Sequence, residues 1–190
     1  HYPRTSDPAQ APRAPNEAHA GDFCIVDRTP SREGYRVFLT LVDTFTGYLF
    51  AMPLTGRTEA DVTTALSIAW TPTFFGTAPR RLHFDGEPAV ERSRIVQHFF
   101  HSRGVRVTFS NAGKSCQNAT AERANRTIQT VARSLLTHAR LPFCFWSDAV
   151  LHAVEILNRR RGPPHCPQSP AEKQHGVPPR GRLYVFGATA

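Results

Sequence analysis

Short runs of β-branched and aromatic residues limit the folds open to this chain more than any other feature. Three of them, at residues 23–27 (FCIVD), 35–43 and 47–54, follow one another closely. Runs of this composition and length are typical of strands, and their tight spacing predicts an antiparallel meander. Two further runs, at residues 80–85 (RRLHFD) and 105–109 (VRVTF), predict a fourth and a fifth strand.

Apolar residues at helical spacing separate the later strands and follow them. They predict helices over residues 58–70, 91–103, 119–138 and 145–158, and a short capped helix over residues 169–176. A terminal strand is expected over residues 182–188 (RLYVFGA). Three antiparallel strands, then alternating helices and strands, then helices are typical of an α/β domain with one mixed sheet flanked by helices.

The first residues of the chain differ in composition from the rest. Residues 1–20 are rich in Pro and Ala, show no periodicity and are expected to form a linker, with order beginning at Phe23. A chain of 190 residues with 40% hydrophobic content can bury one core. Because the chain begins at His1 rather than at methionine, we expect it to be a piece of a longer protein.

The basic charge of the chain predicts an anionic partner. The formal net charge is +8 and the isoelectric point is about 10.0. Nucleic acid is the commonest partner of such a protein, although a basic surface can also serve solubility alone. All basic residues except Lys114 and Lys173 are arginines, whose planar side chains suit bidentate contacts to phosphate. A GC-rich coding sequence would produce the same bias.

The cysteines and the hydropathy pattern argue against a zinc site and against a membrane span. The four cysteines are widely spaced and include no Cys-x-x-Cys pair, so a zinc site of the usual spacing is not expected. No secretory signal opens the chain, and no apolar run reaches the length of a membrane-spanning helix. We therefore expect an intracellular protein with reduced thiols and no membrane partner.

Three carboxylates occupy positions at which catalytic side chains can converge. Asp27 and Asp85 each end an apolar run, and Glu122 lies in the first turn of a helix that follows a polar loop. Phosphodiester hydrolysis or transfer must stabilise an attacking and a leaving oxygen, which two divalent ions do at a separation of roughly 3.5–4 Å. Three acidic side chains supply the hard oxygen ligands that two Mg²⁺ ions need. Taken singly, such residues are more often turn residues or partners of the helix dipole.

A series of motifs gives the three carboxylates a context. In order along the chain stand GDFCIVDRTP (21–30), LTLVDTFTGYLFAMPL (39–54), HFDGEP (83–88), QNATAERANRT (117–127), LPFCFWSDAV (141–150), ILNRR (156–160), SPAEKQHG (169–176) and VFGA (185–188). Together they make the chain resemble the integrases of LTR retrotransposons, particularly those of the Ty1/copia group. The resemblance is most specific around Glu122.

The resemblance implies an RNase H-like fold, with residues 21–160 as the integrase catalytic core and residues 161–190 as its C-terminal extension. It places the catalytic and metal-binding carboxylates at Asp27, Asp85 and Glu122, and it implies two Mg²⁺ or Mn²⁺ ions as cofactors. The implied reaction is 3′-end processing of element DNA and its strand transfer into target DNA.

Three other carboxylates are set aside by the same comparison of motifs. Asp22 matches the Glu that opens the first strand of the family. Asp43 lies where the family has a non-catalytic Asp before a turn. Glu87 matches an acidic residue of the family segment for which we expect a structural role.

One face of the helix that carries Glu122 is expected to contact DNA beside the metal site. The helical candidates lie three to eleven residues after Glu122 and share its face. The expected DNA-binding residues are Lys114, Gln117, Asn125, Arg126, Gln129 and Arg133. A solvated polar face is the plainer interpretation, but the presence of Glu122 on the same face favours DNA contact.

The partners implied by the resemblance are element-end DNA and target DNA, and joining to two target strands implies at least a homodimer. The implied location is the nucleus, with a cytoplasmic particle stage. Ala119 in place of the family Gly, and residues 110–116 without the usual Thr-Pro, leave an alternative open. That alternative is a catalytically inactive or domesticated integrase-like module for nucleic-acid binding or assembly. The Trp146 and Asn158 motifs argue against a nuclease of another RNase H-like family.

Overall fold

The computed structural model of the chain describes residues 11–26, 29–85, 88–110 and 118–188. The strands are β1 (Ala18–Ile25), β2 (Val37–Asp43), β3 (Leu49–Leu54), β4 (Arg81–Phe84) and β5 (Arg106–Phe109). The helices are α1 (Glu59–Ala69), α2 (Pro88–Glu91), α3 (Arg94–Ser102), α4 (Ala119–Ala139), α5 (Trp146–Arg159) and α6 (Pro170–His175), with a 3₁₀ turn η3 (Phe143–Phe145) before α5.

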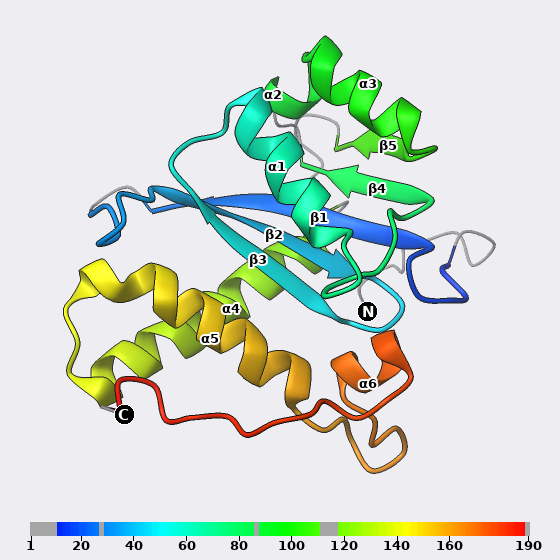
Figure 1. Cartoon of the computed structure of the whole chain (residues 1–190). Helices are drawn as coiled ribbons and strands as arrows, with labels where there is room; N and C mark the ends of the chain where they lie inside the picture. Colours follow the sequence, from blue (N-terminus) through cyan, green and yellow to red (C-terminus); the bar gives the residue numbers. More distant parts are fainter. Residues whose placement is uncertain (1–10, 27–28, 86–87, 111–117, 189–190) are drawn as a thin grey trace, which may run out of the picture.

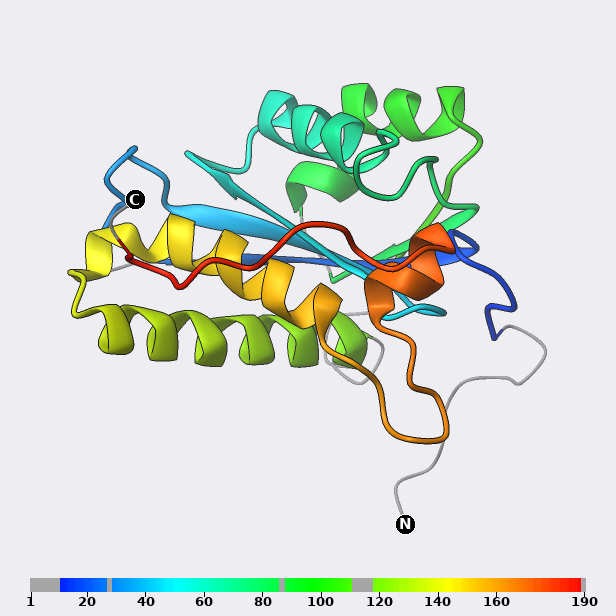
Figure 2. The same ribbon diagram turned by 60° about the horizontal axis from the view of Figure 1, so that its bottom comes forward.

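These elements form three layers, with the sheet in the middle. Helices α1 and α3 lie on one face of the sheet and α4 and α5 on the other (Figure 1). The layers stay separate when the molecule is turned (Figure 2). The predicted five-stranded mixed sheet flanked by helices is therefore confirmed. Within the described residues, no helix has the length and hydropathy needed to span a membrane.

The central strand of the sheet is β1. The strand order is β3-β2-β1-β4-β5. Strands β1, β2 and β3 pair antiparallel, as the predicted meander requires, whereas β4 pairs parallel with β1 and with β5. Parallel neighbours need crossover connections, and α1 and α3 provide them on the same face of the sheet.

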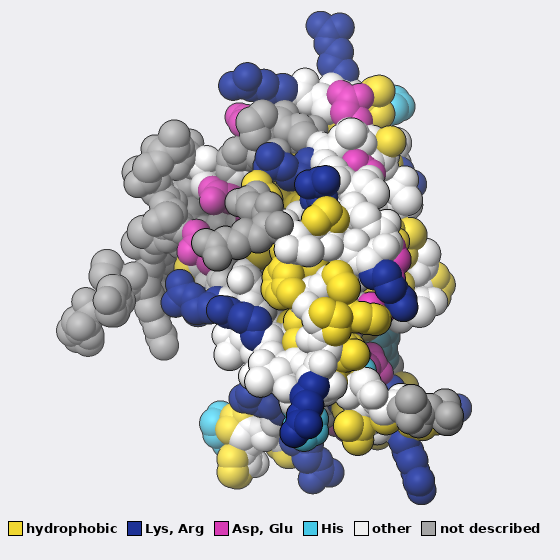
Figure 3. Space-filling view, turned by 90° about the vertical axis from the view of Figure 1, so that its left-hand side faces the viewer, with side chains coloured by type: hydrophobic (Ala, Val, Ile, Leu, Met, Phe, Trp, Pro, Cys, Tyr) yellow, Lys and Arg dark blue, Asp and Glu magenta, His cyan; other side chains and the backbone are white. Residues whose placement is uncertain are grey.

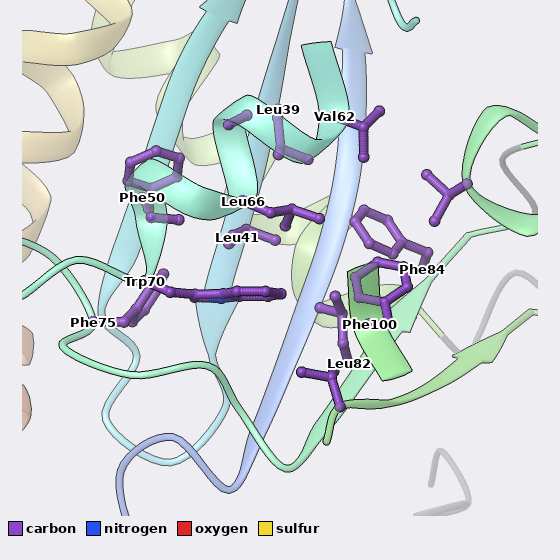
Figure 4. Packing of buried hydrophobic residues seen from close by; sticks show 14 of the residues in the cluster. Leu39, Leu41, Phe50, Val62, Leu66, Trp70, Phe75, Leu82, Phe84 and Phe100 are labelled. Carbon is purple, nitrogen blue, oxygen red and sulfur yellow. The ribbon is translucent and has the colours of Figure 1, made fainter. Parts of the chain in front are cut away.

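Hydrophobic side chains pack against both faces of the sheet. The cluster beneath α1 and α3 includes Leu39, Leu41, Leu66, Phe84 and Phe100 (Figure 4). The cluster beneath α4 and α5 includes Phe38, Ile128, Trp146, Ala149 and Val150. Successive side chains of a strand point to opposite faces, so Leu39 and Leu41 of β2 enter the first cluster and Phe38 enters the second. The nearly continuous apolar sequence of β2 thus reflects burial on both sides.

A buried carboxylate, Asp43, holds the turn between β2 and β3. Its Oδ1 accepts hydrogen bonds from the Thr46 amide at 2.7 Å and the Thr46 hydroxyl at 2.8 Å, and its Oδ2 accepts one from the Asn16 amide at 2.7 Å. His19 lies beside it, and burial lowers the pKa of the His19 ring to about 4. These contacts give Asp43 the structural role that the motif comparison expected.

The first strand begins earlier than the sequence predicted. Ala18 already pairs with Arg81 of β4, and His19 and Ala20 are buried. The predicted linker over residues 1–20 is therefore too long at its end by three residues, since β1 starts at Ala18. The sequence did not predict the start of β1 at Ala18, because His and Ala have no marked preference for strands.

Residues 182–188 do not form the predicted terminal strand. The segment lies along α5 (Figure 2), where the rings of Phe186 and His152 are 5.5 Å apart. The open edges of the sheet belong to β3 and β5, and the segment runs along a helix instead. An apolar run needs an unpaired strand edge within reach before it can add a strand.

Asn158 of α5 completes the hydrogen bonds at the open edge of β3. Its Oδ1 accepts a hydrogen bond from the Leu49 amide at 2.8 Å, and its Nδ2 donates one to the Leu49 carbonyl at 2.7 Å. Asn158 is buried, so its amide stands in for the neighbouring strand that this edge lacks.

We predict that Asn158→Ala lowers the free energy of unfolding by roughly 2–4 kcal/mol, because it leaves two buried backbone groups without partners. Urea denaturation followed by circular dichroism measures the change. Leu151→Ala, an exposed truncation on the same helix, should cost about 1 kcal/mol or less. An equal, small loss in both variants would contradict the assigned role of Asn158.

Candidate functional site

The parallel register of β1 and β4 brings two carboxylates to neighbouring positions in the sheet. Gly21 of β1 pairs with Phe84 of β4, and each is followed directly by an aspartate, Asp22 and Asp85. Gly21 allows this close pairing, because a Cβ there would lie 2.5 Å from Cε1 of Phe84. Side chains alternate along a strand, so Asp22 points to the opposite face of the sheet, where α4 lies.

Polar contacts hold the first half of α4 against β1. Nδ2 of Asn118, just before the helix, donates to the Gly21 carbonyl at 3.0 Å. One turn past Glu122, Nδ2 of Asn125 donates to Oδ2 of Asp22 at 2.9 Å. Because Asn118 and Asn125 fix the helix on both sides of Glu122, that carboxylate lies beside Asp22.

Asp22 and Glu122 line one open hollow of about 510 Å³ between β1 and α4. The other lining residues are Phe23, Cys24, Ile25, Asn125, Arg126 and Gln129. Nε2 of Gln129 donates to Sγ of Cys24 at 3.0 Å, which closes the hollow on the side away from Glu122.

Asp22 shares an electrostatic environment with the other two carboxylates. The pKa of Asp22 is raised to about 6, with burial as the largest cause and the negative charges of Asp85 and Glu122 as smaller ones. Hydrogen bonds from the Phe23 amide and from Asn125 oppose the shift. The three acidic side chains therefore interact electrostatically. They are Asp22 of β1, Asp85 at the end of β4 and Glu122 of α4.

His83 links β4, the strand that ends just before Asp85, to β5 and to the residue that follows β5. Its Nδ1 lies 2.9 Å from Oγ1 of Thr108 and its Nε2 lies 3.1 Å from Oγ of Ser110. Burial lowers the pKa of His83, and the charge of Asp85 opposes that change. A neutral ring with both nitrogens in hydrogen bonds ties β4 to β5 and limits movement of the strand end before Asp85.

The structure locates only some of the predicted site residues. Asp85 is exposed at the end of β4 and Glu122 is half-buried on α4. Asp27, Lys114 and Gln117 lie outside the described residues, so their predicted roles stay predictions.

The four predicted DNA-binding residues on α4 differ in their exposure. Arg126 is exposed at the hollow of Asp22 and Glu122, and Gln129 is half-buried there. Asn125 is buried and donates to Asp22, so its first role is to position that carboxylate. Arg133 is exposed and lines a neighbouring, mostly apolar hollow between β1 and the start of α5. Figure 3 shows hydrophobic side chains gathered in the middle of one face, with Lys and Arg side chains around them.

The motif comparison set Asp22 aside, yet the structure brings it together with Asp85 and Glu122. A signal for this was present in the sequence. Asp22 follows a glycine inside a strand, and an ionisable side chain inside a strand is rarer than one at its end. The parallel pairing of β1 with β4 sets Asp22 beside Asp85. Local patterns in the sequence do not show this pairing.

The three carboxylates provide the donor chemistry of a divalent-cation site. Their oxygens are the hard ligands that Mg²⁺ and Mn²⁺ prefer. Among the residues that the structure describes, no group of three or more His, Cys, Asp or Glu side chains is placed to hold one ion directly. Burial is the largest cause of the raised pKa of Asp22 and repulsion from Asp85 and Glu122 adds to it; a bound cation would favour the charged carboxylate against both. The residues thus fit such an ion in charge and ligand type, and ligation would need rotation of their side chains.

Solved structures with the same fold define the class of this domain. A chain of the simian T-cell lymphotropic virus intasome, in complex with PP2A regulatory subunit B56 gamma, aligns with a TM-score of 0.72 and 21% identity, over 93% of this chain and 59% of that chain. The HTLV-2 integrase catalytic core domain in complex with magnesium aligns with a TM-score of 0.68 in its trimeric form and 0.67 in its dimeric form, each at 21% identity over 85% of this chain and 98% of that chain. The domain therefore has the RNase H-like fold of retroviral integrase catalytic cores.

The family model described as the integrase core domain matches residues 12–115, and the chain belongs to that family. Two curated relatives are the retrovirus-related Pol polyproteins from transposon RE2 of Arabidopsis thaliana and transposon TNT 1-94 of Nicotiana tabacum. The first is 32% identical over 160 residues, 83% of this chain, and the second 30% identical over 138 residues, 73% of this chain. The chain spans 11% and 10% of the length of these relatives. The resemblance to retroelement integrases is thereby confirmed.

We predict that Asp22→Asn makes the protein more stable at neutral pH. The folded protein raises the pKa of Asp22 from 3.8 to about 6, so below pH about 4 the residue is protonated whether the chain is folded or not. Between pH about 4 and about 6 the unfolded chain has lost this proton while the folded protein keeps it, so the stability of the wild type falls over this range and that of the variant does not.

Thermal melts in a metal chelator should show a higher Tm for Asp22→Asn than for the wild type at pH 8 and equal values near pH 3.5. A gain of 1 kcal/mol corresponds to roughly 2–4 °C for a domain of this size. Glu91→Gln on α2 removes a charge outside the hollow and should leave the pH profile unchanged. A lower Tm for Asp22→Asn at pH 8 would contradict the raised pKa.

Proposed function

We propose that this integrase core domain is a metal-dependent DNA polynucleotidyl transferase that processes the 3′ ends of element DNA and transfers them into target DNA. The observation that carries the proposal is the electrostatic coupling of Asp22 with Asp85 and Glu122. Two of the three carboxylates line an open hollow, where a DNA strand has access. The basic charge of the chain supports the same substrate class.

The first carboxylate of the site has two candidates. The motif comparison favours Asp27, and the pairing of β1 with β4 together with the contact from Asn125 favours Asp22. We propose Asp22 as the residue that acts with Asp85 and Glu122, since its pKa responds to both.

Two divalent cations would supply the activation of the attacking oxygen and the stabilisation of the leaving oxygen. The residues that would hold them are Asp22, Asp85 and Glu122. Asn125 keeps Asp22 in place through its hydrogen bond to Oδ2. Arg126, exposed beside Glu122, binds a DNA phosphate and orients the strand, as Arg133 does further along α4. No covalent intermediate with the protein is needed, because the 3′-hydroxyl of one strand attacks the phosphorus of a target phosphodiester directly, and the bond from that phosphorus to the 3′-oxygen of the target strand breaks.

The proposal predicts the effect of single substitutions on strand transfer. Asp85→Asn, Glu122→Gln and Asp22→Asn should each reduce Mg²⁺-dependent strand transfer at least about a hundredfold, because a divalent cation contributes several kcal/mol to the transition state. Asp27→Asn should retain activity near that of the wild type. The assay measures joining of a labelled oligonucleotide to a target duplex by the longer protein that contains this domain.

A measurement of metal binding without chemistry accompanies this assay. Mn²⁺ should raise the Tm of the wild type and of Asp27→Asn, and it should not raise the Tm of Asp22→Asn. Full strand transfer in Asp22→Asn together with its loss in Asp27→Asn would identify Asp27, and not Asp22, as the first carboxylate of the site. Metal binding and DNA binding without any transfer in the wild type would favour the alternative, an inactive integrase-like assembly module.

We also propose that the domain forms at least a dimer and acts in the nucleus. A hollow of about 380 Å³ between β3, α1 and α5 is lined mostly by apolar residues, among them Phe50, Met52, Ile68, Phe74 and Leu151. Ile68 is 36% exposed and Leu151 is 47% exposed. Exposed apolar side chains beside a hollow are typical of interfaces, and the HTLV-2 integrase catalytic core has been solved in a dimeric and a trimeric form.

Ile68→Glu with Leu151→Glu should convert an oligomer to a monomer, because the added charges would be buried at the interface. Light scattering coupled to size-exclusion chromatography measures the molar mass. Ile95→Glu, at a residue 62% exposed on α3 and outside this hollow, is the matched control and should leave the mass unchanged. A dimer that survives the double substitution would rule out this face.

A further inference from the structure

A second hollow, lined by cationic side chains, lies beside the start of α4. It has a volume of about 300 Å³. Its charged lining residues are Arg123, Arg160, Arg161 and Lys173. No Asp or Glu side chain lines it, and none of the four cationic side chains forms an ion pair with another residue that the structure describes. We call this feature the cationic hollow.

The cationic hollow is separate from the hollow of the carboxylates, although both use α4. Arg123, Ala124 and Thr127 line the cationic hollow, whereas Glu122 and Asn125 line the other. At 3.6 residues per turn these two sets lie on nearly opposite sides of the helix. With side chains a helix is about 10–12 Å wide, so the two hollows are roughly one helix diameter apart.

Several segments that are distant in sequence build the cationic hollow. They are the turn before β3, the start of α4, the end of α5 with the segment after it, and α6. Figure 2 shows the end of α5 and its connection to α6 near the start of α4, as the shared lining requires. Gly162 is needed in the connection, because a Cβ there would clash with the Cys166 carbonyl oxygen. The backbone thus folds closely on itself and sets the direction of the two arginines before Gly162.

We propose that the cationic hollow binds the phosphate backbone of a DNA duplex, at a position that the carboxylates do not contact. Four cations that line one hollow without an acidic side chain among them repel one another, and an anion removes that cost. Arginine predominates among them, and its planar fork matches two phosphate oxygens. The side-chain amide of Gln168, also in the lining, can donate a further hydrogen bond to phosphate.

The position on α4 favours DNA over an acidic protein segment. Arg126 and Arg133 are exposed toward the carboxylate side of the helix, and Arg123 is exposed toward the cationic hollow. Positive charge therefore continues across the outer surface of α4 from one hollow to the other. The B-DNA major groove is about 12 Å wide, close to the width of a helix, so phosphates on both sides of a groove can meet both sides of α4. This proposal needs DNA as the ligand of the domain and does not need the transferase chemistry.

Binding to a random-sequence DNA duplex, measured by fluorescence anisotropy in a metal chelator over a series of salt concentrations, tests the proposal. The double variant Arg160→Ala with Arg161→Ala should lower the slope of log affinity against log salt by about 1.8, from about 0.9 for each lost phosphate contact. Its affinity at low salt should fall about tenfold or more. Adding Lys173→Ala should lower the slope by about 0.9 more, because one more phosphate contact is lost.

Arg92→Ala with Arg94→Ala is the matched control, because it removes the same charge from exposed positions next to α3, on the other face of the sheet. The control should keep the slope of the wild type. This assay measures binding in a metal chelator, whereas the strand-transfer assay needs Mg²⁺, so failure of the transferase proposal and failure of this one are distinguishable.

An unchanged slope in the double variant would overturn the proposal, and so would an equal loss in the control. Polyglutamate is the probe for the competing ligand, an acidic protein segment. If the double variant loses polyglutamate binding and keeps its DNA binding, the hollow is a site for an acidic protein segment and the proposal is wrong. Equal far-UV circular dichroism spectra and Tm values establish that the variants are folded.

Discussion

The parallel pairing of β1 with β4 is the interaction on which the candidate site depends. It sets Gly21 opposite Phe84, so the next residue of each strand is an aspartate beside the other. Gly21 has no Cβ and leaves room for the Phe84 ring, and a side chain there would push the strands apart. A shift of one residue in this register would turn Asp22 to the other face of the sheet, away from α4.

Helix α4 converts this pair of carboxylates into a group of three. Asn118 and Asn125 bind β1 through side-chain amides, so the helix is located by polar contacts as well as by the apolar cluster around Ile128. Such contacts are directional, and they fix the rotation of the helix more closely than apolar packing does. The arrangement buries Asp22 and keeps it near two other acidic groups, and both raise its pKa at a cost in stability above that pKa. Local costs of this kind are typical of functional sites.

The proposed surfaces of the domain use different sides of the same framework. The carboxylate hollow lies between β1 and α4, and the cationic hollow lies between α4, the end of α5 and α6. The mostly apolar hollow proposed for self-association lies between β3, α1 and α5. Because α4 borders both of the first two hollows, DNA that crosses its outer surface can meet phosphate-binding residues on each side while the third surface stays available to a second copy.

The sequence by itself determined the five strands, the main helices and the family. Strand composition and helical spacing are local properties, and burial on both faces makes β2 and the apolar stripes of α4 and α5 easy to recognise. The motifs that contain Asp85 and Glu122 were likewise recognisable, and the catalytic roles of these residues stay predictions, while the start of β1 and the end of the chain were predicted wrongly. Tertiary structure alone decided that Asp22 faces both of them and that Asn125 supports it rather than standing free for DNA. It also brought Arg123 together with Arg160, Arg161 and Lys173. The physical reason is that strand register and helix packing join residues far apart in sequence, such as Asp22 and Asn125, which are 103 positions apart, and no local pattern of composition records which residues will meet.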